Sequence, residues 1–233
     1  KHKDCNVSIP IWTTTAWNLT ANQAVALNAE LPYVLVETEI KGIVERLVLA
    51  KGLASDALQR FGAENTRVLA SFDGATLQGL EMRHPFYERI VPVINGEHVT
   101  LDAGTGAVHI APGHGQEDFS AGVQNDLPLD NPVGGDGVYL NSTEIYAGQY
   151  IYKAAKEILL QLEENGRLLR QEAFVHSFPH CWRHKTPLIF RATPQWFVSL
   201  DQNGLRDDAL KAIRDVQWIP GWGEQRIEGM VSG

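Results

Sequence analysis

The sequence predicts an α+β protein that is rich in β-structure and barrel-like, and not a doubly wound α/β sheet. Short segments of β-branched and aromatic residues dominate the first two-thirds of the chain, whereas few segments have helical periodicity. The regular alternation of strand and helix that a parallel sheet requires is missing. With 233 residues, 44% of them hydrophobic, the chain is long enough to bury a sizeable core.

Five short segments in the first half have the composition of strands. Lys41-Gly42 separates two of them as a turn, and Asn95-Gly96 is a strong hairpin signal because both residues tolerate positive φ. The predicted strands cover residues 7–15, 33–37, 46–50, 88–94 and 98–101.

Three segments have the apolar spacing of helices. The clearest covers residues 150–165 and is ended by Asn165-Gly166. A short helix is expected at residues 55–61 with Ser55 as N-cap, and another at residues 204–216. After Phe174 the chain becomes aromatic-rich, extended and punctuated by prolines.

The net charge of −8 argues against nucleic-acid binding through a broad basic surface. Residues 153–191 nevertheless carry +3 and the rest of the chain −11, so a small local contact with RNA remains open. Cys5 and Cys181 do not suggest a disulfide framework, which predicts a reducing, cytoplasmic setting. No apolar stretch approaches the ~20 residues of a membrane span, so no membrane partner is expected.

The first candidate motif is WTTTAW, at residues 12–17. In an extended segment, Thr13 and Thr15 are expected on one side and Thr14 on the other. Two interpretations remain open from these residues alone. One is an ordinary strand with a polar face, and the other is a row of hydroxyls that orients a water molecule or a ribose.

The second candidate motif, GTGAVHIAPGHGQEDF, covers residues 104–119 and contains His109, His114, Glu117 and Asp118. Its glycines and prolines allow sharp turns and a close backbone approach to a ligand. A metal site, a nucleophile site and a pocket that activates water are the alternatives. The spacing fits no usual zinc pattern, and no serine or cysteine stands beside these groups. Either histidine could instead be structural.

Together the two motifs resemble the editing-domain signatures of isoleucyl-tRNA synthetases. WTTTxW and GTGxVHxAPGHGxED occur in the family's order, as do ANQAVALN, NPVGGDG, CWRHKTP and RATPQWFVS, so the resemblance covers nearly the whole chain. Valyl and leucyl relatives usually have arginine and proline after a Thr-Thr pair and lack the His-x-Ala-Pro-Gly-His-Gly form. The isoleucyl branch is therefore favoured.

The resemblance implies a β-barrel-like editing domain, inserted in a class I synthetase, that hydrolyses valine wrongly attached to tRNA(Ile). Asp118 matches the family's acid that holds the substrate's α-ammonium. His109 matches the histidine beside the substrate side chain and ribose, which helps to exclude isoleucine. The threonines at 13–15 match those that contact the adenosine or position the attacking water, and Trp17 matches an aromatic of the same pocket. His114 is expected to be structural, as is the neighbouring Glu117.

The resemblance requires no cofactor, because an aminoacyl ester is already activated and hydroxyls, a carboxylate and backbone N–H groups suffice to hydrolyse it. ATP and Mg belong to the synthetic site of the parent enzyme. Cys181-Trp-Arg-His184 stands where some relatives have a zinc half-site, but no second ligand pair follows, so no metal is expected. Ala16 and Thr20 replace two prolines of the family, which predicts a looser turn after the threonines.

Residues 7–173 are predicted to form the editing domain, and residues 174–233 a connecting segment that returns to a catalytic core absent from this sequence. HIGH-like and KMSKS-like motifs are missing. The expected partners are the 3′ end of tRNA(Ile) carrying valine, and valyl-adenylate, bound by a monomer. Two alternatives remain: a non-catalytic module that binds the aminoacyl group or the tRNA 3′ end, and a valyl-type editing domain acting on a threonyl ester, which His109 disfavours.

Overall fold

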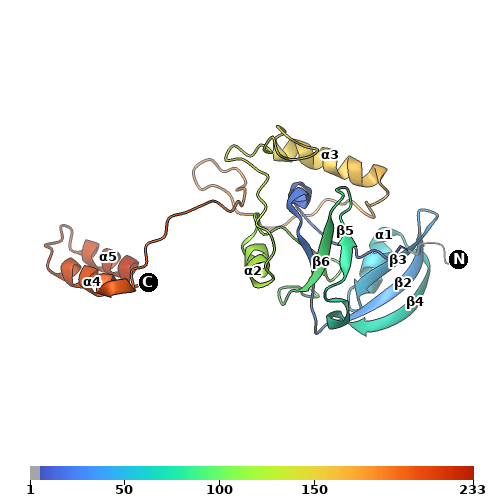
Figure 1. Cartoon of the computed structure of the whole chain (residues 1–233), viewed down its shortest axis with the longest axis horizontal. Helices are drawn as coiled ribbons and strands as arrows, with labels where there is room; N and C mark the ends of the chain where they lie inside the picture. Colours follow the sequence, from blue (N-terminus) through green and yellow to red (C-terminus); the bar gives the residue numbers. More distant parts are fainter. Residues whose placement is uncertain (1–5) are drawn as a thin grey trace. The chain divides into compact units, whose positions relative to one another are not determined.

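The computed structural model describes residues 6–233, which form two compact units divided between Ala192 and Thr193. Cys5 lies outside the described residues. Figure 1 shows the strands of the first unit, with the helices around them. The elements of this unit are η1 (Ala16–Ala21), β1 (Ala24–Leu27), β2 (Pro32–Ile40), β3 (Ile43–Ala50), α1 (Ala54–Phe61), β4 (Glu64–Asp73), η2 (Gly74–Leu77), β5 (Glu81–Arg83), β6 (Ile90–Asn95), β7 (Ala107–Ile110), α2 (Gln116–Gln124) and α3 (Ile151–Glu164).

The first sheet is antiparallel and has the strand order β3-β2-β4, with α1 packed on it (Figure 1). β2 and β3 pair from Tyr33↔Ala50 to Ile40↔Ile43. Lys41 and Gly42 form the two-residue turn between them, both with positive φ, as a tight hairpin requires. The predicted strands at residues 33–37 and 46–50, and the turn that joins them, are confirmed.

The second sheet has the order β5-β6-β1-β7, in which β1 pairs parallel with β6 and antiparallel with β7. The two sheets share one apolar core, to which β1, β2, β3, β6 and β7 all contribute buried side chains. The backbone N–H of Ala50 also donates to the carbonyl of Thr105 across 2.9 Å and so links the end of β3 to the segment before β7. These observations confirm a β-rich α+β protein.

Residues 7–15 do not form the predicted strand. Ser8 alone makes a bridge to Leu47, and the rest of the segment is irregular up to η1. Pro10 has no N–H to donate to a ladder. The N–H of Thr15 is taken by the hydroxyl of Thr13 at 3.1 Å, a local bond that competes with strand pairing.

The predicted hairpin at Asn95-Gly96 is also wrong, because residues 98–101 form no strand and β6 pairs with β1 and β5 instead. Gly96 has no positive φ in the structure. A Cβ on Gly96 would lie 2.9 Å from the Cβ of Ala26, and its N–H donates to the carbonyl of Leu27 at 2.8 Å. The glycine is needed for a close approach of two chain segments rather than for a turn.

The helix predicted at residues 55–61 begins one residue earlier, at Ala54. Ser55 is not its N-cap, because Leu53 occupies that position and makes no side-chain capping bond. Gly62 ends the helix in the left-handed conformation, at φ 68°.

The helix predicted at residues 150–165 is confirmed as α3. Its buried residues Ile151, Ala154, Ile158 and Leu162 recur at helical spacing and pack in one core cluster with Trp17 of η1. In the part of the chain that the structure describes, no helix is long and apolar enough to cross a membrane.

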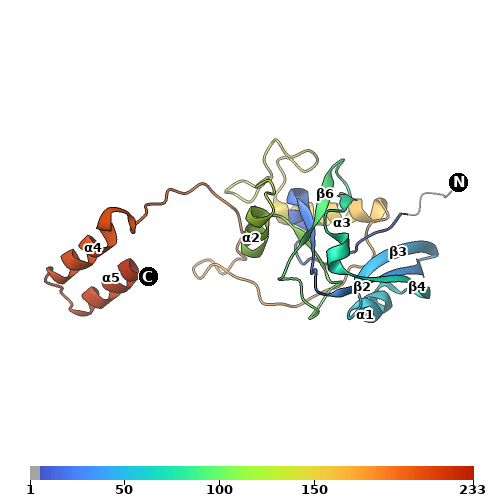
Figure 2. The ribbon, with the colours of Figure 1, turned by 60° about the horizontal axis from the view of Figure 1, so that its bottom comes forward.

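The second unit contains η3 (Gln202–Gly204), α4 (Leu205–Arg214) and α5 (Trp222–Ser232). Figure 2 shows α4 and α5 side by side. α4 confirms the helix predicted at residues 204–216, whereas α5 was not expected from its Gly- and Trp-containing sequence. Residues 174–192 belong to the first unit by their contacts. The boundary at residue 174, which concerns the parent protein, stays a prediction.

Candidate active site

The first motif is a short irregular segment that leads into η1. The hydroxyls of Thr13 and Thr15 lie 3.5 Å apart, whereas Thr14 is exposed. Thr13 and Thr15 therefore share one side, as expected, although a local turn and not a strand brings them together. Trp17 is buried, and its carbonyl accepts hydrogen bonds from the hydroxyls of Tyr139 and Thr20. Thr20, which replaces a proline of the resembled family, thus closes the following turn through its side chain.

The second motif begins with a turn that only glycine allows. Gly104 and Gly106 have φ of 85° and 79°, and a Cβ on Gly106 would lie 2.1 Å from the Cβ of Ala50. The carbonyl of Gly106 accepts a hydrogen bond of 2.7 Å from the hydroxyl of Tyr33, a fully buried side chain of β2. The first sheet therefore fixes the turn that leads into β7.

The two motifs lie beside each other and touch at both ends. At the first end, the position of a Cβ on Gly104 is 3.2 Å from the Cβ of Trp12, and the hydroxyl of Thr105 donates to the carbonyl of Pro10 at 2.6 Å. At the other end the rings of Trp17 and His114 meet edge to face, with centroids 5.0 Å apart. Two segments about ninety residues apart in sequence thus form one continuous structure.

Asp118 lies in the first turn of α2 and is tied to the end of β7. Its Oδ2 accepts a hydrogen bond of 2.9 Å from the backbone N–H of Ala111, two residues after His109. Burial raises the pKa of Asp118, while the hydrogen bond from Ala111 and the charge of His98 act in the opposite direction. Within residues 6–233 no hydrogen bond to its other oxygen, Oδ1, is present.

Three buried histidines surround the middle of the site, and burial lowers the pKa of each. The pKa of His109 falls to about 4, with smaller contributions from His84 and His114. The pKa of His84 also falls to about 4; its Nε2 lies 2.9 Å from the carbonyl of Leu19, and its Nδ1 accepts the N–H of Tyr87 at 3.1 Å. All three imidazoles are therefore neutral near pH 7.

His109 and His114 differ in their hydrogen bonds. His114 lies 2.9 Å from the carbonyl of Phe190 through Nδ1, and the pKa of its imidazole is lowered by burial. Its Nε2 is buried and has no hydrogen-bond partner within the described residues. His109 pairs with Val25 in the sheet, and its buried Nδ1 has no hydrogen-bond partner within the described residues. A buried nitrogen without a partner is costly, so both imidazoles are candidate ligand-binding groups, and the expectation that His114 is structural stays a prediction. Glu117 is exposed on α2.

A cavity of about 200 Å³ lies along the turn that precedes β7. Threonines 13–15, His109 and Asp118 do not line it, although Trp12 and Val108 are their immediate neighbours in sequence. Two of the lining residues were not expected from the sequence: Trp12, which directly precedes the threonines, and His98, which was assigned to a hairpin strand. The lining residues are Trp12, His98, Val99, Thr100, Asp102, Ala103, Gly104, Thr105, Gly106, Ala107 and Val108.

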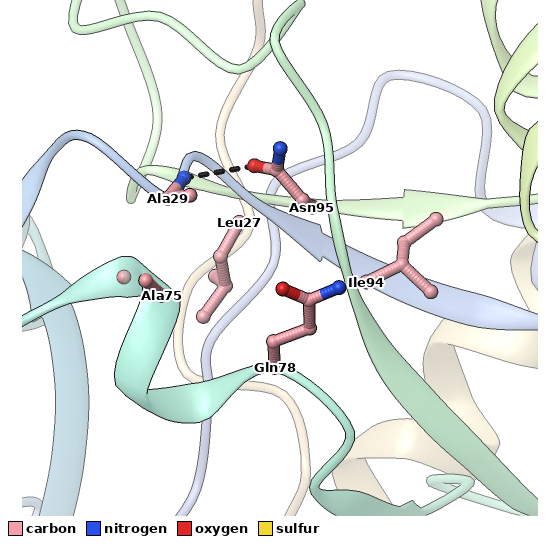
Figure 3. A pocket seen from close by; sticks show the side chains of 7 residues that line it. Leu27, Ala29, Ala75, Gln78, Ile94 and Asn95 are labelled. Carbon is pink, nitrogen blue, oxygen red and sulfur yellow. Dashed lines mark hydrogen bonds between the residues drawn. The ribbon is translucent and has the colours of Figure 1, made fainter.

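Two further features of the structure share no residue with the candidate site. Figure 3 shows a hollow between η2 and the strands β1 and β6, lined mainly by small and apolar groups, where Asn95 accepts the N–H of Ala29. At the second place, the sulfur of Cys181 lies 3.3 Å from Nδ1 of His184. Residues 6–233 contain no group of three or more side chains able to hold a metal ion, so the Cys-x-x-His pair has no further ligands there.

The chain belongs to the class I tRNA synthetases, because the family model for the I, L, M and V enzymes matches residues 13–233. Within this family it is similar to isoleucine–tRNA ligases. The enzyme of Methylococcus capsulatus is 59% identical over 226 residues, which are 97% of this chain and 24% of that relative. The enzyme of Nitrosococcus oceani is 56% identical over 225 residues, with the same two shares. The chain thus spans about a quarter of the length of these relatives.

Solved editing domains share the fold. The crystal structure of GlLeuRS-CP1 aligns with a TM-score of 0.55 at 14% identity, over 76% of this chain and 87% of that one. The editing domain of the P. knowlesi cytosolic leucyl-tRNA synthetase aligns with a TM-score of 0.54 at 9% identity, over 68% and 82%. The chain therefore matches a region of isoleucine–tRNA ligases and has the fold of leucyl-tRNA synthetase editing domains, which confirms the resemblance found in the motifs.

Proposed function

We propose that this chain hydrolyses valine wrongly esterified to tRNA(Ile), and valyl-adenylate, by attack of a positioned water molecule. The contact of the two motifs at both ends supports the proposal most directly, because it brings the segment that contains the threonines alongside the segment that contains His109 and Asp118. A water oxygen attacks the ester carbonyl, the bond to the ribose oxygen breaks, and that oxygen takes up the proton. Free valine and uncharged tRNA are the products.

Asp118 is the group that binds the α-ammonium. Its Oδ2 is held by Ala111, which fixes the carboxylate while Oδ1 remains for a ligand. Burial raises its pKa, so that an ammonium group near the carboxylate stabilises the ionised form that burial disfavours. A charge-assisted hydrogen bond of this kind contributes about 1.5–3 kcal/mol.

His109 acts on the substrate side chain as a neutral group. It is almost fully buried, rigidly placed by its pairing with Val25, and uncharged because burial lowers its pKa to about 4. A rigid neighbour can reject the additional methylene of isoleucine by steric exclusion. Such a second, smaller pocket is needed, because one methylene contributes only about 1–3 kcal/mol in an apolar site, a value known from the discrimination of isoleucine and valine itself.

Thr13, Thr14 and Thr15 supply the hydroxyls that orient the water molecule or the terminal adenosine. Thr13 and Thr15 already bond to each other, so their oxygens are fixed, and Thr14 is accessible from outside. A positioned water is sufficient because the ester is activated, and fixing its approach removes much of the entropic cost of the reaction. The chemistry needs no cofactor, and the chain acts as a monomer.

Deacylation of Val-tRNA(Ile) and Ile-tRNA(Ile) by the purified chain tests the proposal. We expect release of valine well above the uncatalysed rate and little release of isoleucine. Valine release at the background rate would refute the hydrolase. Binding of a non-hydrolysable valyl ester analogue without turnover would identify the chain as a binding module instead.

A further inference from the structure

Five aromatic rings form an unbroken row that starts at the cavity. Trp12, in the cavity wall, meets Phe174 edge to face with centroids 4.9 Å apart. The row continues through His176, Phe178 and His180 at spacings of 5.8, 5.9 and 6.4 Å. Because alternate side chains of an extended segment point to the same side, every second residue from 174 to 180 contributes a ring. We call these five residues the ring row.

The ring row is open to solvent over most of its length. Phe174 is 48% exposed, His176 and His180 are exposed, and Phe178 and Trp12 are half-buried. Aromatic rings assembled for a core would be buried among apolar side chains. Here two of the five are imidazoles, which offer both a flat face and a polar edge.

The segment around the ring row is positively charged, although the chain as a whole is acidic. Residues 167–185 carry four cations, Arg167, Arg170, Arg183 and Lys185, against one acid, Glu172. This segment is therefore +3 in a chain of −8. The guanidinium of Arg183 lies over the Trp182 ring, 4.8 Å from its centre. Flat faces beside positive charge are the features that bind single-stranded nucleic acid.

We propose that the ring row binds the unpaired nucleotides at the 3′ end of the tRNA and leads the aminoacylated terminus past Trp12 toward the threonines that directly follow it. This inference rests on the proposed function, since it describes how the same substrate reaches that site. Bases stack on aromatic faces whatever their sequence, and the flanking cations meet the phosphates. A double helix does not fit the surface, because its base faces are already stacked on one another.

Binding of a labelled RNA of about eight nucleotides ending in CCA, followed by fluorescence anisotropy, tests the ring row without any amino acid. We expect the double variant His176→Ala/Phe178→Ala to bind the RNA at least about five-fold more weakly than the unchanged chain. Tyr152→Ala is the matched control, because this exposed tyrosine of α3 contacts Tyr150 but not the ring row. It should bind the RNA normally, and a blunt duplex of equal length should bind weakly to all three proteins.

The two proposals fail in different ways. RNA binding that is undetectable, or equal in the double variant and the unchanged chain, would refute the proposal that the ring row binds RNA. The exposed rings would then be assigned to contact with a protein partner. Loss of RNA binding in the double variant, together with no hydrolysis of Val-tRNA(Ile) by the unchanged chain, would retain the ring row and refute the hydrolase. If both proposals hold, the double variant should hydrolyse Val-tRNA(Ile) with a raised KM and a nearly unchanged kcat.

Discussion

Mild acid should destabilise the fold, because its site contains histidines that are buried in the neutral form. His84 and His109 have folded pKa values of about 4, against about 6.5 in an unfolded chain. Between these values the unfolded chain binds protons that the folded chain does not. The free energy of unfolding therefore decreases as the pH falls below about 6.5.

The size of the effect follows from the two pKa values. A pH of 5 lies about 1.5 units below the pKa of an unfolded histidine. At about 1.4 kcal/mol per unit, each buried neutral histidine therefore lowers the free energy of unfolding by about 2 kcal/mol. The two histidines together cost about 4 kcal/mol, a large part of the 5–15 kcal/mol that is typical for a domain. The lowered pKa of His114 adds to this loss. The raised pKa of Asp118 opposes it, because the folded chain protonates that carboxyl first.

Urea unfolding at pH 7 and pH 5, followed by tryptophan fluorescence, measures the difference. We expect His84→Gln to reduce the difference between the two pH values by about half, whatever that variant costs at pH 7. His176→Gln should leave the difference unchanged, because His176 is exposed. A change of less than about 1 kcal/mol between the two pH values in the unchanged chain would refute the assignment of neutral buried histidines.

Three further substitutions test the site. Asp118→Ala should weaken binding of a non-hydrolysable valyl ester analogue by about ten-fold or more in calorimetric titration, and unchanged affinity would rule out the ammonium anchor. His109→Ala should allow the chain to deacylate Ile-tRNA(Ile); continued rejection of isoleucine would show that His109 does not set the specificity. Tyr33→Phe leaves the carbonyl of Gly106 and the N–H of Asn28 without a partner, so thermal unfolding should show a loss of about 1–3 kcal/mol. An unchanged midpoint would show that the Gly106 turn holds without this hydroxyl.

Elements with a strong local pattern could be predicted from the sequence. α3 repeats buried residues at helical spacing and ends at Asn165-Gly166, so one segment contains all the necessary information. The prediction of a strand at residues 7–15 failed for two local reasons. The hydroxyl of Thr13 accepts the N–H of Thr15, and Pro10 has no N–H to donate to a neighbouring strand. The prediction of a hairpin at Asn95-Gly96 failed because the glycine is required by its close contact with Ala26, a residue about seventy positions away. Such contacts leave no periodic signal.

The two motifs predicted the location of the candidate site, but they did not predict the contacts that hold its residues in place. No pattern near Gly106 indicates that Tyr33 of another sheet holds its carbonyl. Likewise His84 lies outside both motifs, although it shares the burial and the lowered pKa of His109. His98 was assigned to a strand, whereas it lines the cavity and its electrostatic interaction with Asp118 lowers the pKa of that carboxyl. Residues that act from outside a motif become visible only when the chain is folded.

The neutral histidines and the half-buried Asp118 carboxylate form one electrostatic arrangement. A substrate with a free α-ammonium would be repelled by imidazolium groups at His84, His109 or His114. Burial keeps these imidazoles neutral near pH 7, so in the proposed function the ammonium approaches the Asp118 carboxylate without repulsion from them. The same burial raises the pKa of Asp118, which makes its charge more favourable when a cation is bound than when the site is empty. If the proposed function holds, the burial that favours binding of the ammonium near neutral pH is also the cause of the loss of stability in acid.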